Sequence, residues 1–344
     1  MKQVAVVILN WNGENHLRNF LPEVIQHSAP HADVWVIDNA STDDSVALLK
    51  KEFPEVHLVQ LKENFGFAGG YNKGLAQIKS DLFVLLNTDV QVTPNWIPPV
   101  LEFMELQDLA ACQPKILNYN NKEWFEYAGA SGGFIDRDGF IFCAGRIFDS
   151  FEQDHGQYNK DKEVFWASGA CLFIRSELYF KVGGFDQDFF AHMEEIDLCW
   201  RLKNRGYRIG ASGKSHVYHV GGGTLHKYNP FKTYLNFRNN LFLLTKNYHH
   251  RPFVPLLFRR LFLDGLAAFR FIIEGNWNYF KAVLKAHVSF YFSFRKTLKK
   301  RKIEHRALQS PNLTGWYTKS VIFDYYLNKK HSFQELDSDD FKQS

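Results

Sequence analysis

Residues 82–89 have the sequence LFVLLNTD, an apolar run that ends in Asn87, Thr88 and Asp89. Three earlier stretches follow the same plan, and each leads into a segment with helical spacing: VAVVILN (4–10), DVWVIDN (33–39) and VHLVQL (56–61). Apolar strands without in/out alternation, separated by helices, predict a mostly parallel sheet that is covered on both faces. The sequence therefore predicts an α/β fold with right-handed crossover connections.

Polar side chains stand at the carboxyl ends of these four predicted strands. In open α/β sheets, ligands bind in the crevice at that edge. Asn and Asp are also common in turns, and Ser41 or Thr42 is expected to cap the next helix, so each residue alone has an ordinary structural explanation. The repetition at four strand ends favours a ligand site, which is formed by Asn10, Asn12, Asp38, Asn39, Asn64, Asn87 and Asp89.

The glycine-rich stretch NFGFAGGYNKG (64–74) follows the third predicted strand. Its glycines do not match the dinucleotide fingerprint G-x-G-x-x-G, and no G-K-[ST] motif lies near it. These absences disfavour a dehydrogenase and a P-loop enzyme. Glycines such as Gly66 still permit close approach of the backbone to a ligand, and the helix that follows presents N–H groups to an anion.

Asp89 is a candidate ligand for Mg²⁺ or Mn²⁺, which prefer carboxylate and phosphate oxygens. His219 is the candidate second ligand, because it ends another predicted strand and precedes a glycine run. A histidine in the core or in a loop is the ordinary alternative. The nearby competitors are His192, His216 and His226.

The stretch MEEIDLCWR places Glu194, Glu195 and Asp197 in the first turn of a helix predicted from about 194 to 205. Acidic residues commonly complement the dipole at a helix start. Three carboxylates in four residues exceed that need, so one of them is a candidate general base. Arg201, one turn further on, is a candidate partner for Asp197.

The chain divides into three parts by composition. Residues 1–228 carry the α/β pattern, with halves at 1–110 and 111–228, and the second half contains Gly-rich stretches that predict hairpins or a pocket built from loops. Residues 229–327 form aromatic-rich helical stretches, neither of the longest being an uninterrupted apolar span. Residues 328–344 are polar, and we expect them to be loose.

Charge concentrates in the helical part. The chain carries a net charge of +4, yet residues 251–310 contain thirteen Lys or Arg and three acids. An amphipathic helix pair at an anionic membrane surface would explain the basic run RKTLKKRK. Helices that pack on the α/β part of the chain or on each other explain the apolar faces equally well, but they explain the basic run less well; the Phe-rich helices could also dimerise. We expect no contact with nucleic acid.

The four cysteines, at 112, 143, 171 and 199, share no metal-ligand spacing and no pairing pattern. They predict free buried thiols and a reducing compartment. The N-terminal apolar run is too short for a signal peptide and is predicted to be the first strand.

The motifs together resemble the inverting glycosyltransferases of family 2, in their rhamnosyltransferase-like branch. The matching stretches run in family order from Val4 to about Thr224: VVILNWNG, VIDNASTDDS, ENFGFAGGYNKGL, LLNTDV, ASGACLFIRSELYFKVGGFDQDFFAHMEEIDLCWRLKNRGY and HVGGGT. The resemblance implies the GT-A fold, with a mostly parallel central sheet flanked by helices and a C-terminal helical extension. It makes residues 1–110 the nucleotide-sugar half and 111–228 the acceptor half.

The resemblance also implies roles for individual residues. Asp38 would hydrogen-bond the nucleotide base, and Asn10, Asn12, Asn64, Gly66 and Asn72 would line the nucleoside and phosphates. Asn87, Thr88 and Asp89 occupy the place of the family's D-x-D motif, with Asn in its first position, so Asp89 would be the main metal ligand and His219 the second. Glu195 matches the general base, with Glu194 as a possible substitute. Trp166, Ser168, Gly169 and Asp197 would border the donor or acceptor sugar.

The implied reaction is a single displacement. A dTDP- or UDP-sugar, with dTDP-rhamnose as one candidate, would transfer its sugar to a hydroxyl of a growing bacterial surface or cell-wall glycan, aided by Mg²⁺ or Mn²⁺. A lipid-linked acceptor would place the enzyme in the cytoplasm, peripheral to the inner face of the cell membrane. A non-catalytic sugar-nucleotide or glycan-binding subunit on the same fold is the alternative. A nucleotidyltransferase would need a G-x-G-x-R type loop near the N-terminus, which LNWNGENHLRN does not supply.

Overall fold

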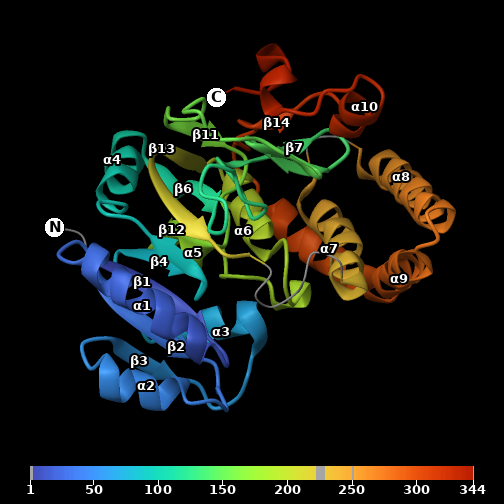
Figure 1. The fold of residues 1–344 in the computed structure, drawn as a ribbon. Helices are drawn as coiled ribbons and strands as arrows, with labels where there is room; N and C mark the ends of the chain where they lie inside the picture. Colours follow the sequence, from blue (N-terminus) through green and yellow to red (C-terminus); the bar gives the residue numbers. More distant parts are fainter. Residues whose placement is uncertain (1–2, 222–228, 250–251, 344) are drawn as a thin grey trace.

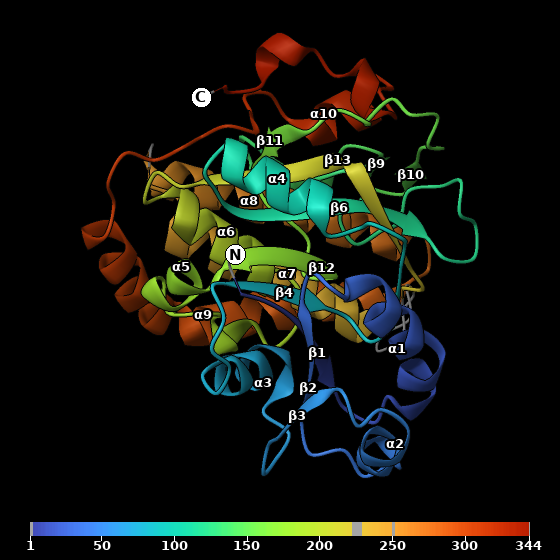
Figure 2. The same ribbon diagram turned by 90° about the vertical axis from the view of Figure 1, so that its left-hand side faces the viewer.

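A computed structural model of the chain describes residues 3–221, 229–249 and 252–343. Its centre is a nine-stranded sheet in the order β11-β13-β6-β12-β4-β1-β2-β3, with β5 paired to β13. Figure 2 shows these strands stacked in that order. The strands are β1 (Val4–Asn10), β2 (Asp33–Asp38), β3 (His57–Gln60), β4 (Leu82–Leu86), β5 (Val90–Val92), β6 (Leu109–Asn118), β11 (Lys162–Val164), β12 (Cys171–Arg175) and β13 (Arg208–His219).

The sheet is parallel in its N-terminal half and mixed beyond it. β3, β2, β1 and β4 are parallel neighbours, as the repeated strand–helix pattern predicts. β12 then runs antiparallel to both β4 and β6, while β6 and β13 are again parallel. β5 and β11 pair antiparallel with β13. The insertion of β12 brings the segment after the acceptor-half hairpins next to the end of β4.

Helices cover both faces of the sheet, and each face has its own apolar core. On one face lie α1 (Glu14–Ser28), α2 (Ser45–Glu52) and α4 (Pro98–Leu106). On the other lie α3 (Gly66–Leu75), α5 (Ser176–Lys181) and α6 (Glu194–Lys203). The predicted helix beginning at Glu194 is confirmed. The four cysteines are buried and free, as expected from their spacing.

A smaller five-stranded sheet has the order β10-β9-β8-β7-β14 and contains the predicted hairpins. Its strands are β7 (Gly133–Asp136), β8 (Ile141–Cys143), β9 (Arg146–Ile147), β10 (Ser150–Phe151) and β14 (Trp316–Tyr317). β14 comes from the C-terminal part of the chain and pairs parallel with β7. Figure 1 shows this C-terminal segment packed beside β7 and β11.

The expectation of a loose tail after residue 327 is wrong. Phe333 and Phe341 place their ring centroids 4.6 Å and 5.3 Å from that of Phe134, and Leu336 is buried. Residue Tyr317 forms a β-bridge with Phe341. Because these few apolar side chains dock on the small sheet, the polar residues between them follow a fixed path over its surface, through α10 (Val321–Tyr326), η2 (Phe333–Glu335) and η3 (Ser338–Asp340).

Three long helices form one side of the molecule, α7 (Pro230–Asn247), α8 (Phe253–Ile273) and α9 (Trp277–Arg306) (Figure 1). Part of the basic run in α9 is used inside the protein. Lys300 donates to Asp186 at 2.5 Å and to Asp188 at 2.6 Å. Lys296 donates to Asp188 at 2.5 Å. Within the described ranges, no helix combines the length and the apolar content needed to cross a bilayer.

Candidate active site

The predicted rim of polar residues exists, and its first members bond to one another. Asn10 and Asp38 are paired in register on β1 and β2, and the Asn10 Nδ2 donates to Asp38 Oδ1 at 3.3 Å. The backbone N–H of Ser41 donates to Asp38 Oδ2 at 3.1 Å. The Oδ1 atom of Asn10 is buried without a hydrogen-bond partner. An acceptor left free in this position is available to a ligand N–H or hydroxyl.

The loop side of the rim is closed by a second set of side-chain bonds. Asn39 donates to Asn64 Oδ1 at 2.8 Å, and the same oxygen accepts the backbone N–H of Gly66 at 2.8 Å. Gly66 has φ +69° with open space around its α-carbon, so a side chain there would be strained by the backbone and not by crowding. Asn12, with φ 52°, accepts the backbone N–H of Thr42 at 2.7 Å.

Asn72 differs from its expected role beside the nucleoside. Its Nδ2 donates to the carbonyl of Phe185 at 2.8 Å, and its Oδ1 accepts from the Phe185 N–H at 2.9 Å and the Tyr179 hydroxyl at 2.6 Å. The amide is therefore engaged on both sides and ties α3 to the segment that precedes α6. The resemblance located the helix correctly but not the direction of this side chain.

Asp89 and His219 lie side by side, as the metal hypothesis requires. β5 follows Asp89 directly and pairs antiparallel with the end of β13, with Val90 opposite His219. The Nε2 of His219 lies 3.2 Å from Asp89 Oδ1 and 3.5 Å from Asn87 Nδ2. Thr88 lies near Gly13, at the Asn10 end of the rim. The four strand ends thus meet at one edge.

Glu126 completes this cluster and was not predicted. Its Oε2 lies 3.0 Å from His219 Nδ1, and the carboxyl is buried. Burial alone would raise the pKa of Asp89 and of Glu126, but their hydrogen bonds and charge interaction with His219 outweigh it and lower both. Burial alone would lower the pKa of His219, and the two carboxylates raise it to about 10. Without a metal, this cluster is a carboxylate–imidazolium–carboxylate chain.

The donor set fits a metal that also binds the donor phosphates. A carboxylate oxygen and an imidazole nitrogen 3.2 Å apart can share one ion, and Glu126 would hold the His219 ring through its other nitrogen. Among the described residues, no group of three or more His, Cys, Asp or Glu side chains is arranged to hold a metal alone. Phosphate and water oxygens would have to fill the remaining positions, as Mg²⁺ and Mn²⁺ accept.

Of the competing histidines, neither described one contacts Asp89. His216 packs edge-on against Tyr218, with ring centroids 5.3 Å apart. His192 lies in the loop before α6, where burial and then the charge of Lys232 lower its pKa to about 4. His226 and residues 222–224 of the HVGGGT motif lie outside the described residues.

The carboxyl pair at the start of α6 has a different electrostatic environment. The Oε2 atoms of Glu194 and Glu195 are both buried without a hydrogen-bond partner. Burial, and then the neighbouring charge of Glu195, raise the pKa of Glu194 well above its usual value. Burial raises the pKa of Glu195 to about 7. Two carboxyl groups with raised pKa values can hold or accept a proton near neutral pH.

Glu195 is the more accessible of the two. Glu194 is only 6% exposed, whereas Glu195 is half-buried. A β-carbon built on Gly169 would lie 3.6 Å from the Glu195 β-carbon, so these two residues are neighbours as predicted. Ser168 holds this segment in place: its hydroxyl donates to the Ala128 carbonyl, and its N–H donates to Gln113 Oε1 at 2.8 Å.

Two residues predicted to border a sugar are part of the interior instead. Trp166 is 3% exposed, and its Nε1 donates to the Phe134 carbonyl at 3.0 Å, so no ring face is free for stacking. Asp197 is fully buried, and it accepts bonds from Arg201, Lys246 and Asn247 at 2.8, 2.9 and 2.8 Å. The expected Asp197–Arg201 pair is present, and Asp197 also anchors α6 to α7 through Lys246 and Asn247.

The sequence matches the family model described as glycosyl transferase family 2 over residues 5–183. The chain therefore belongs to glycosyl transferase family 2. It is a glycosyltransferase, and the match covers the strand-end rim, the Asn87–Asp89 segment and β12. The residues at the start of α6 and His219 lie beyond the matched range.

Curated relatives place the chain near rhamnosyltransferases. It is 26% identical over 257 residues to the N-acetylglucosaminyl-diphospho-decaprenol L-rhamnosyltransferase of Mycobacterium tuberculosis, covering 65% of this chain and 75% of the relative. It is 23% identical to the rhamnosyltransferase WbbL of Escherichia coli, covering 63% and 83%. The predicted family branch is thereby confirmed.

Solved structures confirm the GT-A fold. The mannosyltransferase PcManGT from Pyrobaculum calidifontis, in complex with GDP-Man and Mn²⁺, superposes with a TM-score of 0.53 at 14% identity over 89% of this chain and 86% of its own. GalNAc-T7 with UDP, GalNAc and Mn²⁺ also gives 0.53, at 17% identity over 72% of this chain and 48% of its own. At these identities the likeness concerns the fold alone.

Proposed function

We propose that this enzyme transfers a sugar from a nucleotide-diphosphate donor to a hydroxyl of a bacterial surface or cell-wall glycan, with inversion at the anomeric carbon. A dTDP- or UDP-sugar is the proposed donor, with dTDP-rhamnose first among candidates because two relatives are named rhamnosyltransferases. The Mycobacterium tuberculosis relative is named for a diphospho-decaprenol acceptor, which supports a lipid-linked acceptor here.

The observation that carries this proposal is the opposite tuning of two sets of carboxyl groups. Beside His219, the pKa values of Asp89 and Glu126 are lowered, so both stay ionised. At the start of α6, the pKa values of Glu194 and Glu195 are raised. Such a division separates charge binding from proton transfer, as acid–base enzymes require. One set would serve the diphosphate side and the other the acceptor hydroxyl.

The strand-end rim would bind the nucleotide. Asp38 and Asn10 line the end of β1 and β2, and the free Asn10 Oδ1 offers an acceptor to the base or ribose. Asp89 and His219 would hold Mg²⁺ or Mn²⁺. When bound, such an ion neutralises charge that develops on the leaving diphosphate. Proton loss from His219 would accompany its binding, because imidazole ligates through a lone pair.

Glu195 would then remove the proton of the acceptor hydroxyl. Its pKa of about 7 leaves a large ionised fraction at neutral pH while keeping it a useful base. The hydroxyl oxygen attacks the anomeric carbon from the face opposite the diphosphate, the bond to the diphosphate oxygen breaks, and the configuration inverts. Glu194, which is more deeply buried, would stay protonated and uncharged beside it.

A screen of sugar nucleotides tests the proposal. Donor hydrolysis and thermal stabilisation are measured with Mn²⁺ for dTDP-rhamnose, other dTDP-sugars and UDP-sugars. The active donor is then used with Glu195→Gln and Glu194→Gln. Glu195→Gln should bind the donor as wild type does and lose about 10² to 10⁴ in kcat. Full turnover by Glu195→Gln would exclude Glu195 as the base.

The same enzyme would contact an anionic membrane, at the cytoplasmic face of the cell membrane where a lipid-linked acceptor is presented. The supporting surface is not the whole basic run, since Lys296 and Lys300 are paired with Asp186 and Asp188. It is the outer face of α8 and α9, which we call the apolar face. Its exposed apolar residues are Val254, Phe258, Phe262, Leu266, Phe269, Ile273, Leu284, Val288, Tyr291 and Phe292.

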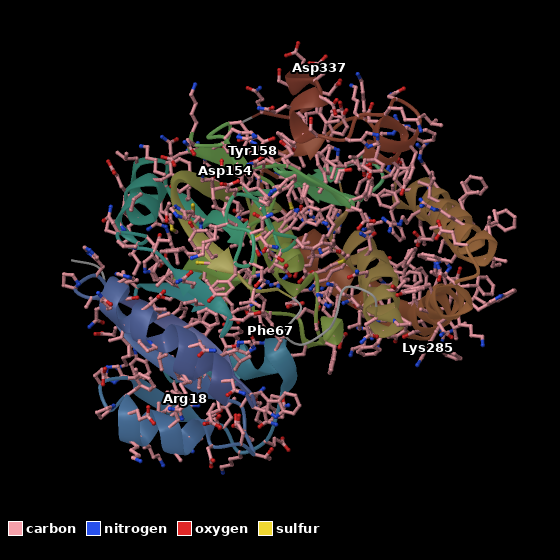
Figure 3. The ribbon with its side chains drawn as sticks, in the orientation of Figure 1. Arg18, Phe67, Asp154, Tyr158, Lys285 and Asp337 are labelled. Carbon is pink, nitrogen blue, oxygen red and sulfur yellow. The ribbon has the colours of Figure 1, made fainter. Side chains whose placement is uncertain are left out.

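The apolar face has the chemistry of an interfacial helix pair. The α8 members recur every three or four residues, so they form one continuous ridge. From residue 275 to 303 the chain contains no Asp or Glu, and Lys281 and Lys285 of α9 are exposed, with the Lys285 Nζ 5.3 Å from the centroid of the Tyr234 ring on α7. Lys285 projects at the edge of α9 (Figure 3). Apolar side chains next to lysines fit the boundary of an anionic bilayer.

Vesicle sedimentation tests the membrane part. Wild-type protein should bind vesicles with phosphatidylglycerol, and Phe262→Ser with Phe269→Ser should reduce binding strongly without lowering turnover on a water-soluble acceptor. Leu106→Ser is the matched control, because Leu106 is an exposed leucine at 72% on α4, away from the apolar face. Equal binding by all three proteins would refute this part. Concentration-dependent dimerisation lost only in the double variant would assign the face to a second copy.

A further inference from the structure

We infer that Asn239 of α7 is a positioning residue for the carboxyl pair at the start of α6. This inference rests on the proposed function for the identity of the base. The inference goes beyond the proposed function because it gives the helical region that follows the family-2 match a part in positioning the proposed base.

The loop between η1 (Gln187–Phe189) and α6 has an unusual backbone. Phe190, His192 and Met193 all have positive φ, at 65°, 68° and 73°. None is glycine, and such conformations persist only where the surroundings enforce them. Met193 is the residue immediately before Glu194. The directions of the Glu194 and Glu195 side chains therefore depend on three preceding residues whose backbone conformation is unfavourable for them.

Hydrogen bonds from Asn239 hold this loop in place. Its Nδ2 donates to the carbonyls of Phe189, Ala191 and His192 at 2.9, 2.8 and 2.7 Å. Two N–H hydrogens thus serve three carbonyls. The side chain is completely buried, so water does not replace these bonds in the folded protein. Each carbonyl that Asn239 holds lies in the segment with positive φ or adjoins it.

The amide of Asn239 is itself oriented. Arg238 donates from Nε and from a terminal nitrogen to Asn239 Oδ1, at 2.9 and 2.8 Å. These bonds fix which end of the amide faces the loop, because the oxygen must point to the guanidinium. The same arginine donates to the Phe189 carbonyl at 2.9 Å. Arg238 and Asn239 therefore act on the loop as one unit.

α7 holds the other end of the same segment as well. Lys246 donates to Asp186, before the loop, at 2.7 Å and to Asp197, in the first turn of α6, at 2.9 Å. Asn247 donates to Asp197 at 2.8 Å. The carboxyl pair thus lies between two attachments to one rigid helix. A shift of α7 would move the pair relative to Gly169 and the strand-end rim.

The chain offers a matched control at the next position. Asn240 is also a buried asparagine on α7, and its Nδ2 donates to the carbonyl of Gly139 at 2.9 Å. Gly139 is in the β7–β8 turn of the small sheet and has no bond to the loop before α6 among the described residues. Asn239→Ala and Asn240→Ala therefore remove the same group from the same helix, with different partners.

The test compares Asn239→Ala, Asn239→Ser and Asn240→Ala in the full chain. Melting temperature, kcat and the donor KM are measured with the active sugar nucleotide, and UDP or dTDP with Mn²⁺ serves as the binding probe. Both Asn239 variants should lose at least tenfold in kcat while donor KM and nucleotide binding stay within twofold of wild type. Asn240→Ala should keep kcat within threefold of wild type, even if its melting temperature falls as far as that of the Asn239 variants.

Two outcomes would overturn the inference. One is a kcat near wild type in whichever Asn239 variant folds, because serine cannot span three carbonyls and alanine bonds none. The other is an equal loss of kcat in Asn239 and Asn240 variants, which would show that α7 acts only through overall stability. Failure of the proposed base is separable: Glu195→Gln would then retain turnover, whatever the Asn239 variants do.

Discussion

The pH dependence of catalysis is the sharpest consequence of the buried carboxyl pair. A general base works in its ionised form, so activity must fall as pH drops through its pKa. Burial raises the pKa of Glu195 to about 7. With this value, about nine-tenths of the base is ionised at pH 8 and about one-tenth at pH 6. An ordinary exposed glutamate, with a pKa near 4.3, would stay ionised across the whole range.

We therefore expect kcat/KM to fall about tenfold between its plateau and pH 6, with a slope that approaches one proton. The assay measures initial transfer rates from pH 5.5 to 9 at saturating Mn²⁺, so that loss of metal from His219 does not produce the same limb. In Glu194→Gln, the fall of kcat/KM on the acidic side of the pH profile should stay near pH 7, because Glu194 is already protonated and its removal takes away no charge.

Glu195→Gln should lower kcat by about 10² to 10⁴, the usual contribution of a general base. A flat profile between pH 6 and 8 at saturating metal would refute the idea that a buried carboxyl is the base. If the fall in activity at low pH disappears in Glu194→Gln while Glu195→Gln stays active, Glu194 is the general base and Glu195 is not.

Further predictions concern residues whose surroundings define other roles. Because the two carboxylates raise the pKa of His219 to about 10, Mn²⁺ must displace a proton when it binds there. Calorimetry should therefore show that the affinity for Mn²⁺ rises about tenfold per pH unit from pH 6.5 to 8.5. This pH dependence should be absent in His219→Gln. Trp166→Phe should cost about 1–3 kcal/mol in chemical denaturation, through its lost hydrogen bond and volume, and leave sugar-donor KM unchanged. Asp197→Asn should cost about 3–5 kcal/mol, because it leaves Arg201 and Lys246 buried without their shared charge. A raised donor KM at unchanged stability in either of these two variants would restore its predicted role at the sugar.

The sequence predicted the sheet and its rim because both depend on local patterns. A buried parallel strand shows itself as an apolar run, and the polar residue at its end needs no knowledge of distant contacts. Asp89 and His219 were paired by the same reasoning, since strand ends of one sheet meet at one edge. Their 3.2 Å separation depends on β5 pairing with β13, a register that no local pattern specifies.

The errors arose where side-chain direction decides the role. The resemblance implies that Asp197 borders a sugar, but its carboxyl turns to Lys246 and Asn247 on α7. Glu126 gave no signal, because one acid in a Gly-rich hairpin region is unremarkable until β13 places His219 beside it. The tail was judged by its polar composition, although a few aromatic anchors such as Phe341 suffice to fix it.

The helical region after residue 229 has two sides with different roles. Its inner side, through Asn239 and Lys246, holds the loop and helix that carry the carboxyl pair. Its outer side is the apolar face of α8 and α9. Lys300 of α9 also binds Asp186 and Asp188, just before that same loop. Because packed helices transmit position as rigid units, a bilayer that engages the outer side would fix the height of the carboxyl pair above the membrane. Under the proposed membrane contact, an acceptor sugar carried on a membrane lipid would meet the proposed base at that height.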